Sequence, residues 1–98
     1  MITSFEIDFL EEMRNLLPRI SLGLLLSKPR EDLFDVASRI GLEYICLNHD
    51  IVTGPLVLDA QKLGFKVYAY GVQNSKDMAR MRRLKVNDVC TDFPELGK

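Results

Sequence analysis

The sequence lacks the residues on which several common kinds of site depend. It has no tryptophan, one histidine and two cysteines among 98 residues. Cys46 and Cys90 are far apart, and no Cys-x-x-Cys motif or Cys/His cluster is present, so neither a zinc site nor a disulfide framework is expected. We predict that both thiols are small, buried hydrophobic side chains.

An excess of one charge and a long apolar segment are also missing. Thirteen basic and fourteen acidic residues give a net charge of −1, so no overall attraction to nucleic acid or to an anionic membrane is expected. The apolar run from Ile20 to Ser27 has eight residues, whereas a membrane-spanning helix needs roughly 20. Glu6 and Asp8 stand where a signal peptide would be basic. We expect no transmembrane segment, no nucleic-acid partner and, by default, a cytoplasmic protein.

The sequence instead shows helix patterns that alternate with strand patterns. Amphipathic helices are predicted at 8–17, 29–40, 55–63 and 75–84. Short apolar strands are predicted at 20–26, 44–47, 66–72 and 88–91, and a further strand ends at 2–5. This alternation predicts right-handed crossovers onto a parallel sheet, which is the α/β class. Since the strand at 20–26 is almost continuously apolar, we expect it to be buried on both faces.

Five strands supply little more than half of a (β/α)₈ barrel, which typically has about 250 residues. We predict one partial domain over residues 1–98, a partial (β/α)₈ barrel or half-barrel. A half-barrel has two open edges, so the chain should dimerise, pair with a missing N-terminal half, or flatten into a small doubly wound sheet. A receiver-type domain with Asp50 as phosphoacceptor would need acidic residues at 2–5, and none is present.

Polar side chains follow the predicted strands, at the end of a barrel where active sites lie. The predicted substrate-binding residues at these strand ends are Lys28, Asn48, His49 and Asp92. A lone loop histidine is more commonly a hydrogen-bonding residue than a general acid, and Asp50 and Asp92 could simply cap loops. A phosphate could bind at the helix start formed by Gln73, Asn74 and Ser75, although this segment also fits an ordinary helix cap.

The helix predicted at 75–84 is locally basic and carries two methionines. Its basic residues and the one after it are Lys76, Arg80, Arg82, Arg83 and Lys85. We interpret them as a solvated outer face because no aromatic residues alternate with them. Met78 and Met81 are predicted to pack in the core.

Several segments together resemble the glycerophosphodiester phosphodiesterase family. Residues 86–94, with Thr91-Asp92-Phe93-Pro94, are similar to the family's closing "GVDGIITDYP" segment. Residues 67–74 fall where the family has its "VWTVN" strand, and Ser4-Phe5 with 18–23 looks like its "SF…P.I.LG.L" segment. The resemblance spans the fourth to the eighth barrel strand.

The resemblance implies metal-dependent hydrolysis of glycerophosphodiesters to an alcohol and glycerol 3-phosphate. The family's two catalytic histidines and the acidic ligands of its divalent metal, Mg²⁺ or Ca²⁺, belong to the N-terminal half of the barrel. His49 matches neither histidine, so no catalytic residue or metal ligand is assigned in this chain, which we expect to be inactive alone. Tyr70 corresponds to the family's tryptophan that lines the substrate pocket, with Gly71 in place of the usual threonine.

Overall fold

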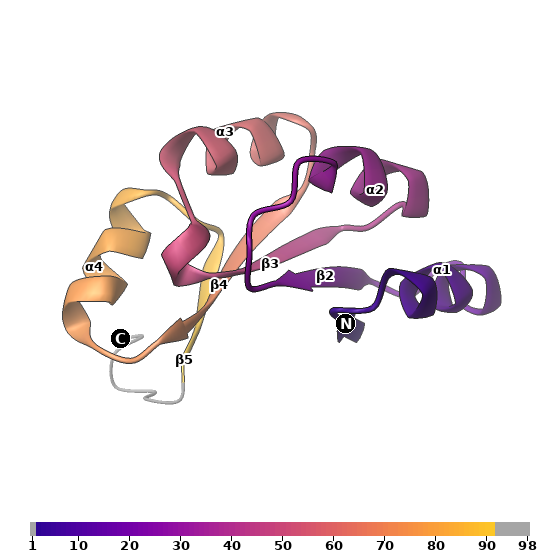
Figure 1. Ribbon diagram of the computed structural model, residues 1–98, viewed down its shortest axis with the longest axis horizontal. Coiled ribbons are helices and arrows are strands. Elements are labelled where there is room, and N and C mark those ends of the chain that lie inside the picture. Colours follow the sequence, from indigo (N-terminus) through magenta and orange to yellow (C-terminus); the bar gives the residue numbers. More distant parts are fainter. Residues whose placement is uncertain (1, 92–98) are drawn as a thin grey trace.

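The computed structural model describes residues 2–91 and contains one five-stranded parallel sheet (Figure 1). The strands are β1 (Ile2–Ser4), β2 (Leu22–Leu26), β3 (Tyr44–Asn48), β4 (Lys66–Val72) and β5 (Asp88–Thr91). The helices are α1 (Ile7–Leu16), α2 (Leu33–Ile40), α3 (Gly54–Lys62) and α4 (Ser75–Arg83), with a 3₁₀ turn, η1 (His49–Ile51). The strand order β1-β2-β3-β4-β5 has no reversal. This order confirms the partial barrel and excludes a doubly wound sheet, whose order reverses at a switch point.

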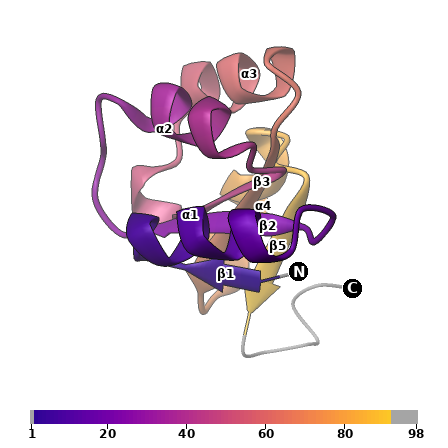
Figure 2. The same cartoon turned by 90° about the vertical axis from the view of Figure 1, so that its right-hand side faces the viewer.

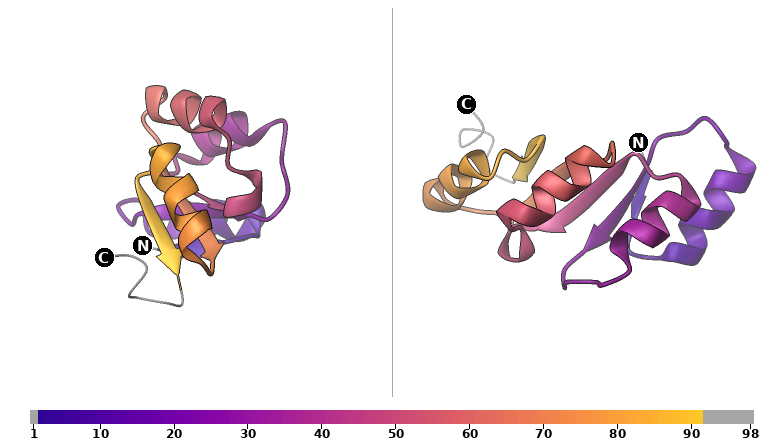
Figure 3. Two further views of the ribbon diagram at one scale, coloured as in Figure 1. Left: turned by 90° about the vertical axis from the view of Figure 1, so that its left-hand side faces the viewer. Right: turned by 90° about the horizontal axis from the view of Figure 1, so that it is seen from above.

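The helices of the described residues lie on one side of the sheet. Seen from above they follow one another in chain order beside the strands (Figure 3), and a side view shows α2 and α3 over the strands (Figure 2). Side chains of alternate strand residues point to this outer side and form the core with the helices: Leu22, Leu24, Ile45, Leu47, Val67 and Ala69. Each strand therefore has one face covered by helices.

The opposite, inner face of the sheet has no such cover within residues 2–91. Leu25, Tyr68 and Tyr70 lie there half-buried, and Cys90 is exposed. Burial of the 20–26 strand on both faces therefore holds at Gly23 but not at Leu25, and the prediction of a buried Cys90 was wrong. The cause is the missing second layer, because a parallel strand is enclosed only where other elements pack on its inner side. Cys46 is buried as predicted, and this burial raises its thiol pKa to about 11.

The helix ends depend on a few polar and glycine residues. Gly41 closes α2 with a φ of 79°, the left-handed conformation that glycine adopts without steric cost. The hydroxyl of Thr53 accepts a hydrogen bond from the Leu56 amide at the start of α3. The largest difference from the predicted starts is in α2, which begins at Leu33 rather than at Pro29, while α1 and α3 begin one residue early. Helix α4 begins at Ser75 as predicted, but Asn74 instead of Ser75 caps it.

The described helices are too short, or too polar, to cross a lipid bilayer. The methionines of α4 are core residues, as predicted, with Met78 and Met81 both buried.

Candidate functional site

The parallel register brings the carboxyl ends of the strands to one edge of the sheet. Asn48 at the end of β3 pairs with Tyr70 in β4. Lys28 follows β2, His49 follows β3, and Gln73 precedes α4. Asp92, the remaining predicted substrate-binding residue, lies outside the described residues. The structure thus places these predicted side chains along one edge, the end of a barrel where substrates bind.

Tyr70 connects two strands that are not neighbours in the sheet. Its hydroxyl donates a hydrogen bond to the carbonyl of Leu26 in β2, over a distance of 3.0 Å. The Phe5 ring meets the Tyr70 ring edge-on, with centroids 6.4 Å apart and planes at 85°. Burial, and then the nearby Cys46 thiol, raise the pKa of Tyr70. The phenol therefore stays neutral, and it forms with Phe5 an aromatic wall at the mouth of the inner face.

A β-bulge follows Tyr70 and involves Gly71. The register of β4 against β5 shifts between Ala69 and Val72, and Gly71 has a φ of 79°. A Cβ atom at Gly71 would stand 3.3 Å from the Asn48 amide nitrogen and 3.5 Å from the His49 ring. The glycine therefore permits both the left-handed backbone and the close approach of the β3 end to β4.

His49 is enclosed between its own loop and helix α4. The imidazole is 14% exposed, and its Nδ1 atom is buried without a hydrogen-bond partner among the described residues. Carboxylate oxygens of Asp50 and Asp77 lie 3.5 Å and 3.9 Å from Nδ1. Two carboxylates of the same edge are thus the neighbours of the His49 ring. Among the described residues, neither carboxylate forms with Nδ1 the hydrogen bond that an acid–base pair would need.

Arg80 of α4 holds the turn that carries His49. Its guanidinium donates to the carbonyls of His49, at 2.8 Å, and of Val52, at 2.7 Å. The prediction that this arginine belongs to a solvated outer face is therefore wrong, whereas Lys76 and Arg83 are exposed as expected. Sequence reasoning missed Arg80 because its acceptors are backbone carbonyls about thirty positions away, which leave no signal in the residue types.

Both asparagines of the site cap their own segments. Asn48 Oδ1 accepts from the Asp50 amide at 3.0 Å, so Asn48 and not Asp50 caps this loop. Asn74 Oδ1 accepts from the Asp77 amide at 2.8 Å, and its Nδ2 donates to the Asp77 carboxylate at 3.0 Å. A phosphate at the start of α4 would therefore meet the Asp77 carboxylate as a neighbour.

Lys28 lies in a groove of about 250 Å³ beside Phe5 and Arg30. Arg30 forms an ion pair with Asp32, and this hydrogen bond lowers the pKa of the Asp32 carboxyl. Lys28 is exposed, and its ammonium group makes no hydrogen bond or ion pair with the described residues. It is therefore a cation of this edge that is open to an anionic ligand.

The described residues do not fit a metal centre by themselves. Between residues 2 and 91, no three side chains of His, Cys, Asp or Glu come together in a group that could hold an ion.

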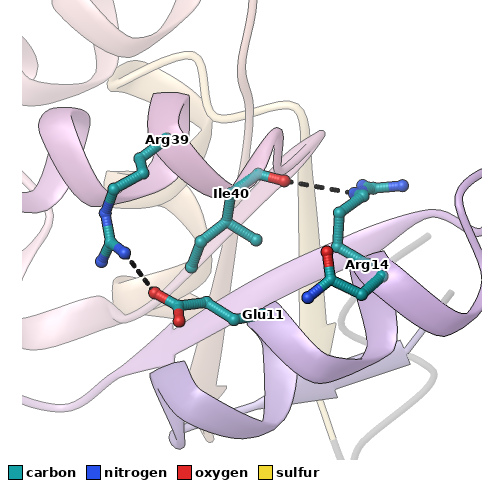
Figure 4. Close-up of a pocket in the computed structure, with 5 residues that line it drawn as sticks. Glu11, Arg14, Arg39 and Ile40 are labelled. Carbon is teal, nitrogen blue, oxygen red and sulfur yellow. Dashed lines mark hydrogen bonds and ion pairs between the residues drawn. The ribbon is translucent and has the colours of Figure 1, made fainter.

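A second pocket, of about 200 Å³, lies between α1 and α2 (Figure 4). Glu11 and Arg39 form an ion pair across it, and Arg14 donates to the carbonyl of Ile40. Its charged groups are used in joining the two helices, so we interpret it as a structural contact.

Comparison with known proteins assigns the chain to a family. The sequence model of the "Glycerophosphoryl diester phosphodiesterase family" matches residues 1–96. The chain belongs to this family. The comparison thereby confirms the predicted membership, over nearly the whole sequence. The search of curated proteins gave no match.

Solved structures of the family share the fold. A putative glycerophosphoryl diester phosphodiesterase from Silicibacter pomeroyi is 27% identical with a TM-score of 0.90, and the match covers 97% of this chain and 35% of that one. An Oleispira antarctica phosphodiesterase, solved with the product sn-glycerol-3-phosphate, is 18% identical with a TM-score of 0.88, over 95% of this chain and 38% of that one. A putative glycerophosphodiester phosphodiesterase from Galdieria sulphuraria is 20% identical with a TM-score of 0.88, and the match covers 95% of this chain and 40% of that one. The chain thus spans about 35–40% of these relatives.

Proposed function

We propose that this chain forms the substrate-contacting C-terminal part of a barrel that hydrolyses glycerophosphodiesters to an alcohol and glycerol 3-phosphate. The observation that carries the proposal is the groove at the carboxyl edge that Lys28 and Phe5 line together, with the Tyr70 ring against Phe5, in a chain matched by the family over residues 1–96. The relative from Oleispira antarctica was solved with sn-glycerol-3-phosphate, which supports this ligand class.

The described side chains suit binding and orientation. The Lys28 ammonium can meet a phosphate oxygen, and the neutral Tyr70 phenol with Phe5 offers an apolar surface to the glycerol carbons. Gln73 and the start of α4, with Asn74 and Ser75, would contribute polar contacts to the phosphate, and Asn48 and His49 would complete the edge. Asp92 is proposed to contact substrate from the end of β5.

Catalysis needs more than these residues supply. A metal-assisted phosphodiesterase requires carboxylates that hold the cation and a group that protonates the leaving alkoxide. When bound, the divalent ion would stabilise charge on the phosphoryl oxygens, and we propose that Mg²⁺ or Ca²⁺ is held by residues of the other part of the barrel. The chain alone is accordingly proposed to be inactive.

The first test is the binding of sn-glycerol 3-phosphate to the chain, followed by NMR titration. We expect the amide shifts to change at the carboxyl ends of the strands, and we expect Lys28→Ala to weaken binding by about tenfold through loss of one charge-assisted contact. Lys62→Ala is the matched control, since Lys62 is exposed in the last turn of α3, at the opposite end of the sheet. Shifts spread evenly over the molecule, or equal weakening in both variants, would contradict the proposed site.

The second test is the hydrolysis of glycerophosphocholine with Mg²⁺ or Ca²⁺, with a chelator as control. No turnover is expected from the chain alone. An ion that bound the folded chain would stabilise it and raise its melting temperature. Because we expect neither ion to bind, the melting temperature should not change. Chelator-sensitive turnover that disappears in His49→Ala would overturn the assignment of catalysis to the other part of the barrel.

The two open edges of the sheet favour a second candidate function. In the described residues β1 pairs only with β2, and β5 only with β4. Such edges invite pairing, so the chain could instead be a non-catalytic half-barrel module for oligomerisation or regulation. Its partner would be the missing N-terminal half or a second copy. Glycerol 3-phosphate binding favours the first function, whereas association without ligand binding favours the module.

A further inference from the structure

The connection from β2 to α2 contains two cations and two carboxylates. Lys28 and Arg30 are followed by Glu31 and Asp32, and all of them are exposed. Although these charges cancel along the sequence, they are separated in space. Both cations line the groove of about 250 Å³ beside Phe5, whereas neither carboxylate is among its lining residues. A segment without net charge thus presents a cationic face to the groove.

Arg30 is held at this groove by Asp32. Its Nε and Nη2 atoms donate to the two carboxylate oxygens of Asp32, at 2.5 Å and 3.2 Å. This side-on pairing uses one edge of the guanidinium, and the Nη1 atom makes no hydrogen bond with the described residues. Because every nitrogen of a guanidinium carries N–H donors, Arg30 still has donors for a ligand while its orientation is fixed.

Asp32 serves this pairing rather than the helix at whose start it stands. It occupies the N-cap position of α2, where an aspartate commonly accepts a hydrogen bond from an amide of the first turn. Its side chain makes no such bond. The segment is anchored by other means, since the Leu33 amide donates to the Arg30 carbonyl at 3.4 Å and the Leu33 side chain is buried in the core. The Pro29 ring also fixes one backbone angle. The carboxylate is thus available to orient the guanidinium.

We propose that Arg30, positioned by Asp32, is a second phosphate-binding cation beside Lys28, and that this pair of cations favours a dianionic phosphate monoester over a monoanionic phosphodiester. The inference rests on the proposed function of this edge. It makes glycerol 3-phosphate the more tightly held ligand, so the product competes with the substrate for the groove. The physical reason is charge, because at one distance a cation attracts a dianion about twice as strongly as a monoanion. The guanidinium also matches the geometry of phosphate oxygens.

The test compares two ligands by NMR titration of the chain at pH 7. There sn-glycerol 3-phosphate is mainly a dianion, since the second pKa of a phosphate monoester is about 6, and glycerophosphocholine carries one phosphate charge. We expect Arg30→Gln to weaken binding of the monoester by about tenfold and of the diester by about threefold, so the preference between them falls about threefold. The Nε–H signal of Arg30 should also shift when the monoester is added. An unchanged ratio of the two affinities in Arg30→Gln would overturn the inference.

The positioning role of Asp32 has a matched control in Glu31. Asp32→Asn and Glu31→Gln each remove one negative charge from adjacent exposed positions, but the ion pair with Arg30 is made by Asp32. Asp32→Asn should weaken monoester binding by about threefold because Arg30 loses its orientation, whereas Glu31→Gln should not weaken it. Asp32→Glu keeps the carboxylate and should restore most of the affinity. Stronger binding in Asp32→Asn, to the same extent as in Glu31→Gln, would reduce the pair to a surface ion pair and contradict the role of Asp32.

Inorganic phosphate as a third ligand separates this inference from the proposed function. If phosphate binds with the expected losses in Arg30→Gln and Asp32→Asn while neither glycerol compound binds, the two cations form a phosphate site and the proposed function is wrong. If glycerol 3-phosphate binds in a way that depends on Lys28 but not on Arg30, the proposed function stands and the inference is wrong. Absence of binding for all three ligands would refute both.

Discussion

The two ends of the sheet are stabilised in different ways. At the amino end, one guanidinium joins several segments: Arg14 donates to the carbonyls of Pro18, Ile20, Ile40 and Gly41 and to the Glu43 carboxylate. Glu43 also accepts from the Leu22 amide at 2.8 Å. At the carboxyl end, Asn48 and Asn74 bond within their own segments, and Lys28 stays open among the described residues.

This difference agrees with the general pattern in (β/α)₈ barrels, in which residues at the amino end of the strands contribute to stability and residues at the carboxyl end form the active site. Polar groups that are all used in joining loops cannot also bind a ligand. Two side chains at the carboxyl end do join segments: Arg80 fixes the turn after β3 through two carbonyls, and the Tyr70 hydroxyl donates to the Leu26 carbonyl of β2. Of the polar side chains of this turn, Asp50 remains exposed, whereas His49 is enclosed.

The largest expected effect comes from Arg14→Ala compared with Arg80→Ala. Arg14→Ala should lower the free energy of unfolding by about 2–4 kcal/mol, because it leaves carbonyls and the Glu43 carboxylate without their partner. Arg80→Ala removes bonds to only two carbonyls, and we expect about 1–2 kcal/mol. Urea unfolding measures both, with the exposed Arg83→Ala as control at under about 0.5 kcal/mol. An Arg80→Ala cost as large as that of Arg14→Ala would break the comparison.

A smaller effect is expected from two glycines, one near each end. Gly64 has a φ of 92° and no heavy atom within 4 Å of where a Cβ atom would stand, so Gly64→Ala should cost about 1 kcal/mol from backbone strain alone. Gly71→Ala adds a contact of 3.3 Å to the Asn48 amide, and we expect about 2 kcal/mol. Thermal unfolding measures the difference. Equal costs would show that the end of β3 can move away from β4, and that the close approach of Asn48 to Gly71 is not required.

The last expected effect is absent at neutral pH and appears as a dependence of stability on alkaline pH. The pKa of Cys46 is raised from 9.0 to about 11 by burial and then by Cys90, so the folded state holds this proton more tightly than the unfolded chain. The contribution to stability is complete below pH 9 and is lost as the pH rises towards 11. Burial also raises the pKa values of Tyr68 and Tyr70, which adds to the fall at higher pH.

Unfolding by urea across this pH range, in the chain and in Cys46→Ala, tests the assignment. The Cys46→Ala variant should lose less stability as the pH rises. The Cys90→Ala variant should keep most of the pH dependence of the unchanged chain, because Cys90 lies exposed on the uncovered side of the sheet. An unchanged slope in Cys46→Ala would mean that other groups cause the pH dependence.

Much of the fold was predictable because it depends on local patterns. The strands at 66–72 and 88–91 match β4 and β5 residue for residue, and the other elements differ by a few positions at their ends. The cap of α4 has a local cause, since the Asn74 side chain accepts from the Asp77 amide, whereas the Asp32 side chain before α2 makes no cap hydrogen bond. The strand-end position of Lys28, Asn48, His49 and Tyr70 was also predictable, since parallel strands must end at one edge.

The sequence by itself determined the alternation of helices and strands, the parallel α/β class and the family, because apolar periodicity and short motifs are local properties. Only the tertiary structure decided which distant groups meet. The bond from Tyr70 to the Leu26 carbonyl, the grip of Arg80 on the turn after β3 and the exposure of Cys90 all depend on how strands curve and helices pack. Backbone carbonyls are the same for every residue type, so a sequence pattern does not show which of them a distant side chain will reach.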